Sequence, residues 1–159
     1  MTTTLNSYVR GAWQAGSGSG QPLHDPTTEQ AIATCDTQGI DFRAVVAHGR
    51  DVGGPAMRAV GFAERAAWLK ALSAAIHEHR EELIAISAEN AGSTRGDAKF
   101  DIDGATGTLA AYASIGKRLG DERFLPDGDG IQLGRTGRFW GQHVRVPRQG
   151  VAVQINAFN

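Results

Sequence analysis

The sequence predicts an α/β fold in which short strands are followed by three helices, a hairpin and a final apolar strand. Three segments carry this prediction. Residues 7–38 combine β-favouring residues with turn signals, residues 62–91 show helical spacing of apolar residues, and residues 150–159 alternate apolar residues with period two. A buried strand at the end of the chain needs sheet neighbours, so we expect this chain to be part of a longer protein.

The first of these segments is expected to hold short strands and turns. Residues 7–13 favour one strand and residues 31–37 favour another. The glycine and serine residues at 15–20 favour a hairpin loop, with a flexible linker as the alternative. Residues 24–28 are typical of a turn.

Three helices are expected, at residues 40–60, 62–91 and 97–119. Asp41 favours the start of the first helix, because an acidic side chain stabilises a helix amino terminus. The Gly-Gly-Pro sequence at 53–55 should interrupt or end this helix, because proline removes a backbone donor.

The second helix shows the clearest pattern. Its apolar stripe consists of Phe62, Ala66, Leu69, Leu72, Ile76, Leu83 and Ile86. The opposite, solvated face is expected to carry Glu64, Arg65, Lys70, Glu78, Glu81 and Glu82. Gly61 is an acceptable cap at its start, and Gly92 is a good stop at its end.

The remaining segments carry packing and turn signals. Gly104 and Gly107 weaken the third helix and predict that another backbone packs closely against it there. The Asp-Gly-Asp-Gly sequence at 127–130 is expected to form a turn. Residues 131–147 alternate loosely and favour a hairpin.

Composition excludes several classes of function. The chain has 159 residues, of which 41% are hydrophobic and 21% charged, as in an ordinary globular protein. A formal net charge of -1 argues against nucleic-acid binding. No apolar run is long enough for a membrane span, and the first residues do not resemble a signal peptide. The single cysteine favours a reducing cytoplasm.

Most side chains that could carry chemistry have simpler structural interpretations. Cys35 lies in a strand-like segment and is interpreted as a small buried hydrophobe rather than a nucleophile. His77 and His79 point to different helix faces and cannot chelate one ion together. Three aspartates are interpreted as helix caps and solvated charges: Asp97, Asp101 and Asp103. No metal site is expected.

The last ten residues differ from these candidates. Residues 150–159 form an apolar run that ends in the polar amide of Asn159. In open α/β sheets, ligands bind beyond the carboxyl ends of the strands, where such an amide can donate to a developing oxyanion. An Asn in an ordinary turn is the alternative, and the residues alone leave the two interpretations open.

Residues 150–159 resemble the first cofactor-domain strand of the aldehyde dehydrogenase superfamily, which begins Gly-Val and leads to an active-site Asn. That Asn falls on Asn159, and the strand Ile falls on Ile155. Ala157-Phe158 stands where most members have Pro-Trp, and Ile-Asn-Ala-Phe-Asn resembles one branch. This branch holds the bifunctional ring-opening enzyme of phenylacetate degradation and the 3,4-dehydroadipyl-CoA semialdehyde dehydrogenase of benzoyl-CoA oxidation. Further similar stretches are Pro55-Ala-Met-Arg-Ala59, Phe62-Ala-Glu-Arg-Ala66, Ser93-Thr-Arg95, Asp101-Ile-Asp-Gly104, Tyr112-Ala-Ser-Ile-Gly116 and Gln142-His-Val144.

The resemblance implies the amino-terminal part of an aldehyde dehydrogenase, with a Rossmann-like cofactor domain. Residues 1–122 would be its hairpins and helices, residues 123–147 the β-ribbon used in oligomerisation, and residues 148–159 the first strand of the cofactor-binding core. The implied reaction oxidises a CoA-linked semialdehyde to an acid with NADP or NAD. A homo-oligomer, dimer or higher, is implied for the complete enzyme.

The resemblance also assigns roles to residues at the end of the chain. Asn159 would hold the oxyanion, while Ile155, Asn156, Ala157 and Phe158 would line the ribose and nicotinamide side of the cofactor. The nucleophilic Cys and the base Glu of the family would lie beyond residue 159, so the segment alone is expected to be inactive. The alternative hypothesis is a non-catalytic helical interaction module that binds partners through residues 62–91.

Overall fold

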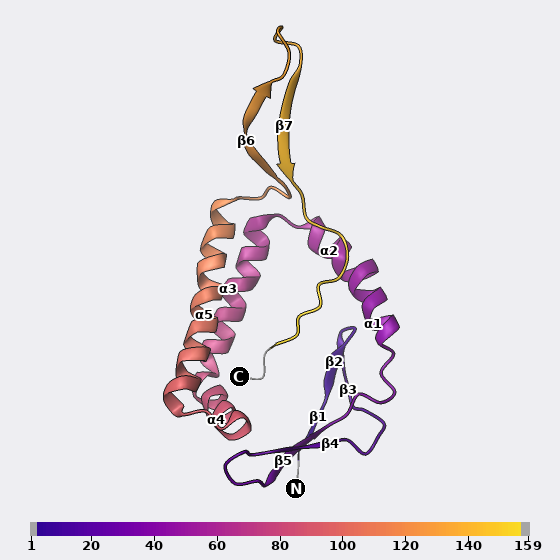
Figure 1. Ribbon diagram of the computed structural model, residues 1–159, viewed down its shortest axis with the longest axis vertical. Helices are drawn as coiled ribbons and strands as arrows, with labels where there is room; N and C mark the ends of the chain where they lie inside the picture. Colours follow the sequence, from indigo (N-terminus) through magenta and orange to yellow (C-terminus); the bar gives the residue numbers. More distant parts are fainter. Residues whose placement is uncertain (1–2, 157–159) are drawn as a thin grey trace.

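The computed structural model describes residues 3–156, and Figure 1 shows the arrangement of their helices and strands. In chain order the elements are β1 (Thr3–Leu5), β2 (Ser7–Val9), β3 (Ala12–Gln14), β4 (Gln21–His24), β5 (Ala31–Cys35), α1 (Phe42–His48), the π-helical turn η1 (Gly49–Gly53), α2 (Gly54–Ala59), α3 (Phe62–Glu78), α4 (Arg80–Ala91), α5 (Arg95–Arg118), β6 (Leu125–Gln132) and β7 (Trp140–Arg145). The expected order of strands, three helical regions and a hairpin is present, in the α/β class.

The amino-terminal strands form two small sheets instead of a chain of hairpins. The first sheet has the order β1-β5-β4, with β1 parallel and β4 antiparallel to β5. Residues 7–13, expected as one strand, turn back on themselves and form the hairpin β2–β3. Arg10 and Gly11 make this turn with φ of 51° and 87°, as a tight hairpin turn requires. The expected hairpin loop at 15–20 is wrong, because it joins two different sheets.

The first helical region runs through its expected interruption. α1 begins at Asp41, whose carboxylate accepts a hydrogen bond from the Ala44 backbone N–H at 2.9 Å, as the acidic residue there predicted. The chain then passes through the wider turn η1 directly into α2. Pro55 lies in the first turn of α2, where the π-helical turn accommodates its missing N–H.

The long helix expected at 62–91 is two helices that meet at His79. His79 has φ −94° and ψ 15°, outside the helical region, and its ring nitrogen lies 3.1 Å from the Glu82 carboxylate in the first turn of α4. The kink lets α3 and α4 pack against different parts of α5. The expected caps are confirmed, since Gly61 precedes α3 and Gly92 follows α4 with φ 66°.

α3 and α5 lie side by side and form the centre of the fold (Figure 1). Gly116 is the point of closest approach, since a Cβ added there would lie 2.9 Å from the Ala66 Cβ and 3.3 Å from the Phe62 carbonyl oxygen. The close packing expected at Gly104 and Gly107 is wrong, because a Cβ on either would meet nothing within 4 Å. Both glycines are exposed.

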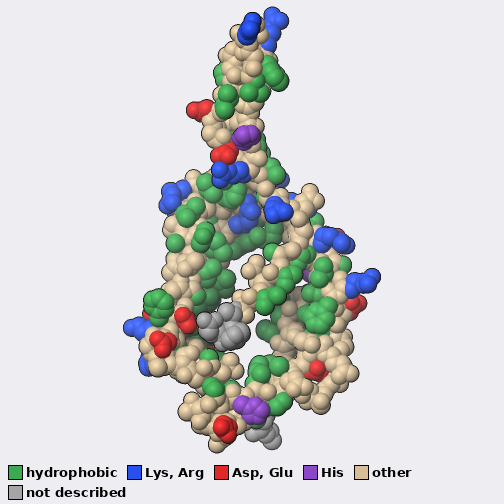
Figure 2. All heavy atoms as spheres, viewed as in Figure 1, with side chains coloured by type: hydrophobic (Ala, Val, Ile, Leu, Met, Phe, Trp, Pro, Cys, Tyr) green, Lys and Arg blue, Asp and Glu red, His purple; other side chains and the backbone are tan. Residues whose placement is uncertain are grey.

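The buried core of the described residues is small. Only apolar side chains are fully buried among them: Ala33, Ile40, Ala66, Ile84, Ala98 and Ala113. Large apolar side chains on α3 and α5 remain about half exposed, including Trp68 at 46% and Tyr112 at 62%. Figure 2 shows hydrophobic side chains along the hollow of the molecule. None of the helices between residues 3 and 156 has the length and apolar character needed to cross a bilayer.

The hairpin β6–β7 projects from the helical part of the molecule (Figure 1). It confirms the hairpin expected in this region. The turn expected at 127–130 is wrong, because these residues lie within β6, at a shift in the pairing register between Asp127 and Ile131. Gly128, with φ 76°, permits this irregularity, which leaves the strand paired on both sides of it.

Candidate functional site

The segment that leads to the expected site runs through residues 147–156, here called the strap. It runs from the end of β7 past α2 (Figure 1). Residues 151–156 belong to no helix or strand, and the exposed fraction rises from 45% at Val151 to 75% at Val153 and 90% at Ile155. The expected strand is therefore not formed here, because no neighbouring strand accepts its backbone hydrogen bonds.

The structure places two of the five expected site residues. Ile155 and Asn156 are exposed at the end of the strap, and no described side chain covers them. Ala157, Phe158 and Asn159 lie outside the described residues. The roles expected for all five residues consequently remain predictions.

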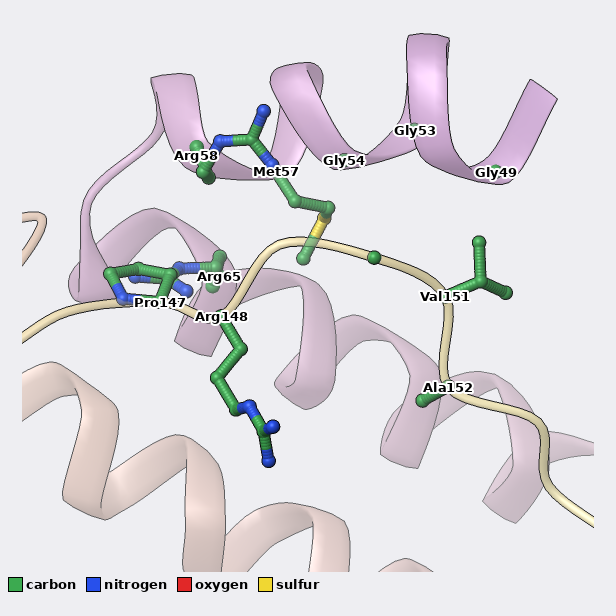
Figure 3. Close-up of a pocket in the computed structure, with 11 residues that line it drawn as sticks. Gly49, Gly53, Gly54, Met57, Arg58, Arg65, Pro147, Arg148, Val151 and Ala152 are labelled. Atoms are coloured by element: carbon green, nitrogen blue, oxygen red, sulfur yellow. The ribbon is translucent and has the colours of Figure 1, made fainter. Parts of the chain in front are cut away.

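The beginning of the strap packs against the first helical region across a cavity of about 350 Å³ (Figure 3). The cavity is lined by Gly49, Gly53, Gly54, Met57, Arg58, Arg65, Pro147, Arg148, Gly150, Val151 and Ala152. Val151 approaches η1 most closely, since its Cγ2 lies 3.2 Å from where a Cβ on Gly49 would be. The glycine at this position therefore allows the strap to lie against the helix.

The position predicted for Arg65 from the helical pattern is wrong. It was expected on the solvated face of the second helix. In the structure its Nε donates to the Gly61 carbonyl at 3.3 Å, and its guanidinium carbon lies 4.5 Å from the centre of the Phe62 ring. Arg65 lies three residues after Phe62 and four before Leu69, so helical spacing puts it on the apolar stripe. This spacing could have predicted its position.

A bidentate ion pair joins α4 to α5. Arg80 of α4 forms a bidentate pair with Asp103 of α5, with Nε–Oδ1 and Nη2–Oδ2 distances of 2.6 and 2.9 Å. The hydrogen bonds from Arg80 lower the pKa of the Asp103 carboxyl below its usual value, although burial acts in the opposite direction. Glu81 joins Arg80 to Arg95 and extends the network.

Asp103, expected as a cap or a solvated charge, instead forms the pair with Arg80. Two other candidate groups also have structural roles. Cys35 is half-buried in β5. Asp97 lies in the first turn of α5, where its backbone N–H donates to the hydroxyl of the capping residue Thr94 at 3.2 Å and its carboxylate accepts from that hydroxyl at 2.7 Å. Across residues 3–156, no three His, Cys, Asp or Glu side chains lie together as metal ligands would.

Comparison with known proteins identifies the family. The model of the aldehyde dehydrogenase family matches residues 13–159, which is nearly the whole chain. The chain belongs to the aldehyde dehydrogenase family. The resemblance seen in the last strand and in the preceding motifs is thereby confirmed.

One curated relative is a semialdehyde dehydrogenase within this family. The chain is 44% identical over 155 residues to the 3,4-dehydroadipyl-CoA semialdehyde dehydrogenase of Aromatoleum evansii. The matched region covers 98% of this chain and 30% of that enzyme. The chain therefore spans less than a third of the length of this relative.

Solved structures agree on the fold. Lactaldehyde dehydrogenase from Escherichia coli matches 86% of this chain and 28% of its own, with a TM-score of 0.73 at 22% identity. An NAD-dependent benzaldehyde dehydrogenase from Corynebacterium glutamicum matches 79% of this chain and 27% of its own, with a TM-score of 0.65 at 21% identity. The described helices and strands thus follow part of the aldehyde dehydrogenase fold.

Proposed function

We propose that this chain is the amino-terminal part of an NAD(P)-dependent dehydrogenase that oxidises a CoA-linked semialdehyde to the acid in aerobic aromatic degradation. The supporting observation is the 44% identity to a CoA-semialdehyde dehydrogenase over 98% of the chain. The family match supports an enzyme and gives no support to the alternative of a non-catalytic helical interaction module. A cytoplasmic location is proposed from the single cysteine.

The end of the strap is compatible with a dinucleotide. Ile155 is 90% exposed and Asn156 is exposed beside it, so an apolar surface and an amide are free to contact a ribose and a nicotinamide ring. With Ala157 and Phe158, these residues are proposed to line that side of the cofactor. When bound, NAD or NADP accepts the hydride that the aldehyde loses.

Asn159 is proposed to hold the substrate oxygen. Its amide N–H would donate a hydrogen bond to the aldehyde oxygen as negative charge develops there, which stabilises the transition state more than the ground state. The nucleophilic Cys and the base Glu are proposed to come from the part of the enzyme beyond residue 159. Residues 1–159 alone are accordingly proposed to be inactive.

The remaining parts of the chain are proposed to support this core. Residues 1–122 would form the hairpins and helices of the cofactor-binding domain, and residues 148–159 would become its first strand when neighbouring strands are present. Residues 123–147 would form the oligomerisation ribbon. The exposed apolar side chains of the ribbon support a dimer or higher oligomer, with Ile131 exposed to 65% and Phe139 to 62%.

Substitution of Asn159 tests the proposed role. In the enzyme that contains this chain, Asn159→Ala should lower kcat by about 10²–10³ and change KM far less, because the lost hydrogen bond forms mainly in the transition state. Asn90→Ala, at an exposed amide in α4, is the matched control and should keep the wild-type kcat. An unchanged kcat in Asn159→Ala would remove this residue from the site.

A further inference from the structure

The amino terminus of α3 holds Arg65 on a rigid base. The Phe62 backbone N–H donates to the Glu122 carbonyl at 3.1 Å, and the Ala63 N–H donates to the Gly120 carbonyl at 2.8 Å. A Cβ on Gly61 would clash with the Asp121 carbonyl oxygen, so the two backbones are in direct contact. The start of α3 is thus fixed to the exit of α5, and Arg65 extends from this junction.

One end of the Arg65 guanidinium lacks an acceptor. Nε is bonded to Gly61, but Nη2 is buried and has no hydrogen-bond partner among the described residues. It is the only buried side-chain nitrogen or oxygen in residues 3–156 with this property. Burying a charged donor without an acceptor is costly, and the atom is too enclosed for water to reach it. The missing acceptor must therefore come from the protein that covers it.

The strap lies beside Arg65 and has carbonyl acceptors to offer. Arg65 lines the same cavity as Pro147, Arg148 and Gly150, and Figure 3 shows Arg65 directly beside Pro147. Between residues 147 and 156, the strap makes no hydrogen bond to any other described residue. A donor without an acceptor thus lies beside a segment whose carbonyl groups have no donors.

We propose that in the complete enzyme Arg65 is a positioning residue that latches the strap, with its Nη2–H donating to a main-chain carbonyl of residues 147–150. The latch ties the strap to the rigid junction of α3 and α5 and sets the path of the chain that continues to Asn159. Only its effect on catalysis rests on the proposed function. Arginine suits this task because its planar fork can donate to Gly61 and to the strap at once, whereas lysine cannot span both acceptors.

Limited proteolysis of the enzyme that contains this chain tests the latch. Trypsin cleaves after the exposed Arg148, and the initial cleavage rate, followed by mass spectrometry, reports how often the strap leaves its place. Arg65→Gln and Arg65→Lys should raise this rate about tenfold, the size of one lost charge-assisted hydrogen bond. Arg58→Gln is the matched control, because Arg58 lines the same cavity and loses the same charge. Cleavage after Arg138, in the ribbon, is the internal reference.

The outcomes separate a latch from a general structural role. Faster cleavage after Arg148 in Arg65→Lys, with Arg58→Gln and the Arg138 reference at wild-type rates, supports the proposal. A wild-type rate in Arg65→Lys overturns it, as does a similar rise at Arg148 and Arg138. If Arg65→Gln does not fold, as judged by loss of its far-UV circular dichroism signal, Arg65→Lys still tests the proposal. The readout needs no enzymatic activity, so the failure of the latch and the failure of the proposed function are distinguishable.

Discussion

Gly116 offers a direct test of how α3 and α5 are packed. In Gly116→Ala the new Cβ would lie 2.9 Å from the Ala66 Cβ and 3.3 Å from the Phe62 carbonyl oxygen. Ala66 is only 4% exposed and has no rotamer to change, and the Phe62 oxygen belongs to the backbone. The two helices must therefore separate to admit the methyl group. Overpacking of this kind costs about 1–3 kcal/mol, against a gain of about 1 kcal/mol from the better helix propensity of alanine.

Gly104→Ala is the matched substitution in the same helix. A Cβ there meets nothing within 4 Å, so only the propensity gain remains, about 0.5–1 kcal/mol. We expect Gly116→Ala to lose roughly 1 kcal/mol and the two variants to differ by about 2 kcal/mol. Urea unfolding followed by far-UV circular dichroism measures this difference as a shift of about 1 M in the midpoint. A midpoint for Gly116→Ala equal to or above that of Gly104→Ala would refute the packing described for α3 and α5.

Three further substitutions test other parts of the fold. Ile84→Ala should destabilise the chain by about 2–5 kcal/mol in urea unfolding, because Ile84 is 1% exposed and the truncated side chain leaves a cavity. A loss of unfolding free energy smaller than that caused by an alanine substitution at an exposed position would contradict the burial of Ile84. Thr94→Ala should cost about 1 kcal/mol through the lost cap of α5, and an unchanged midpoint would show that the cap is not formed. The pKa of Asp103 is lowered in the folded chain, so its pairing with Arg80 stabilises at neutral pH and is lost as the pH falls below the ordinary aspartate range. Asp103→Asn should therefore reduce stability at neutral pH and flatten the acid limb of the stability curve, while Asp101→Asn should leave that limb as in the wild type.

The elements with strong local signals were predictable from the sequence. Asp41, Gly61 and Gly92 mark helix ends through capping and left-handed backbone, which depend on neighbouring residues only. The motifs at 150–159 and before it were sufficient to identify the family. Local chemistry therefore predicted the order of the elements, and the resemblance carried by these motifs predicted the family.

The features that depend on tertiary contacts were not predictable in this way. Gly104, Gly107 and Gly116 have the same local character, and only the path of α3 decides which of them lies at a helix contact. The kink at His79 lies between two helices that both contact α5, and these contacts are not visible in the sequence pattern. Arg65 was assigned to solvent from its charge, whereas its spacing from Phe62 places it over an aromatic ring. The strand expected at 150–159 needs partner strands, and no strand of the described chain pairs with residues 150–156.

The proposed dehydrogenase activity is tested most directly by the reduction of NADP or NAD. The enzyme that contains this chain should reduce the cofactor when supplied with 3,4-dehydroadipyl-CoA semialdehyde, the substrate named for the relative that is 44% identical. The purified 159-residue chain should give no reduction under the same conditions. Absence of reduction by the enzyme with this and other CoA-linked semialdehydes would contradict the proposed function, and turnover by the isolated chain would contradict its proposed inactivity.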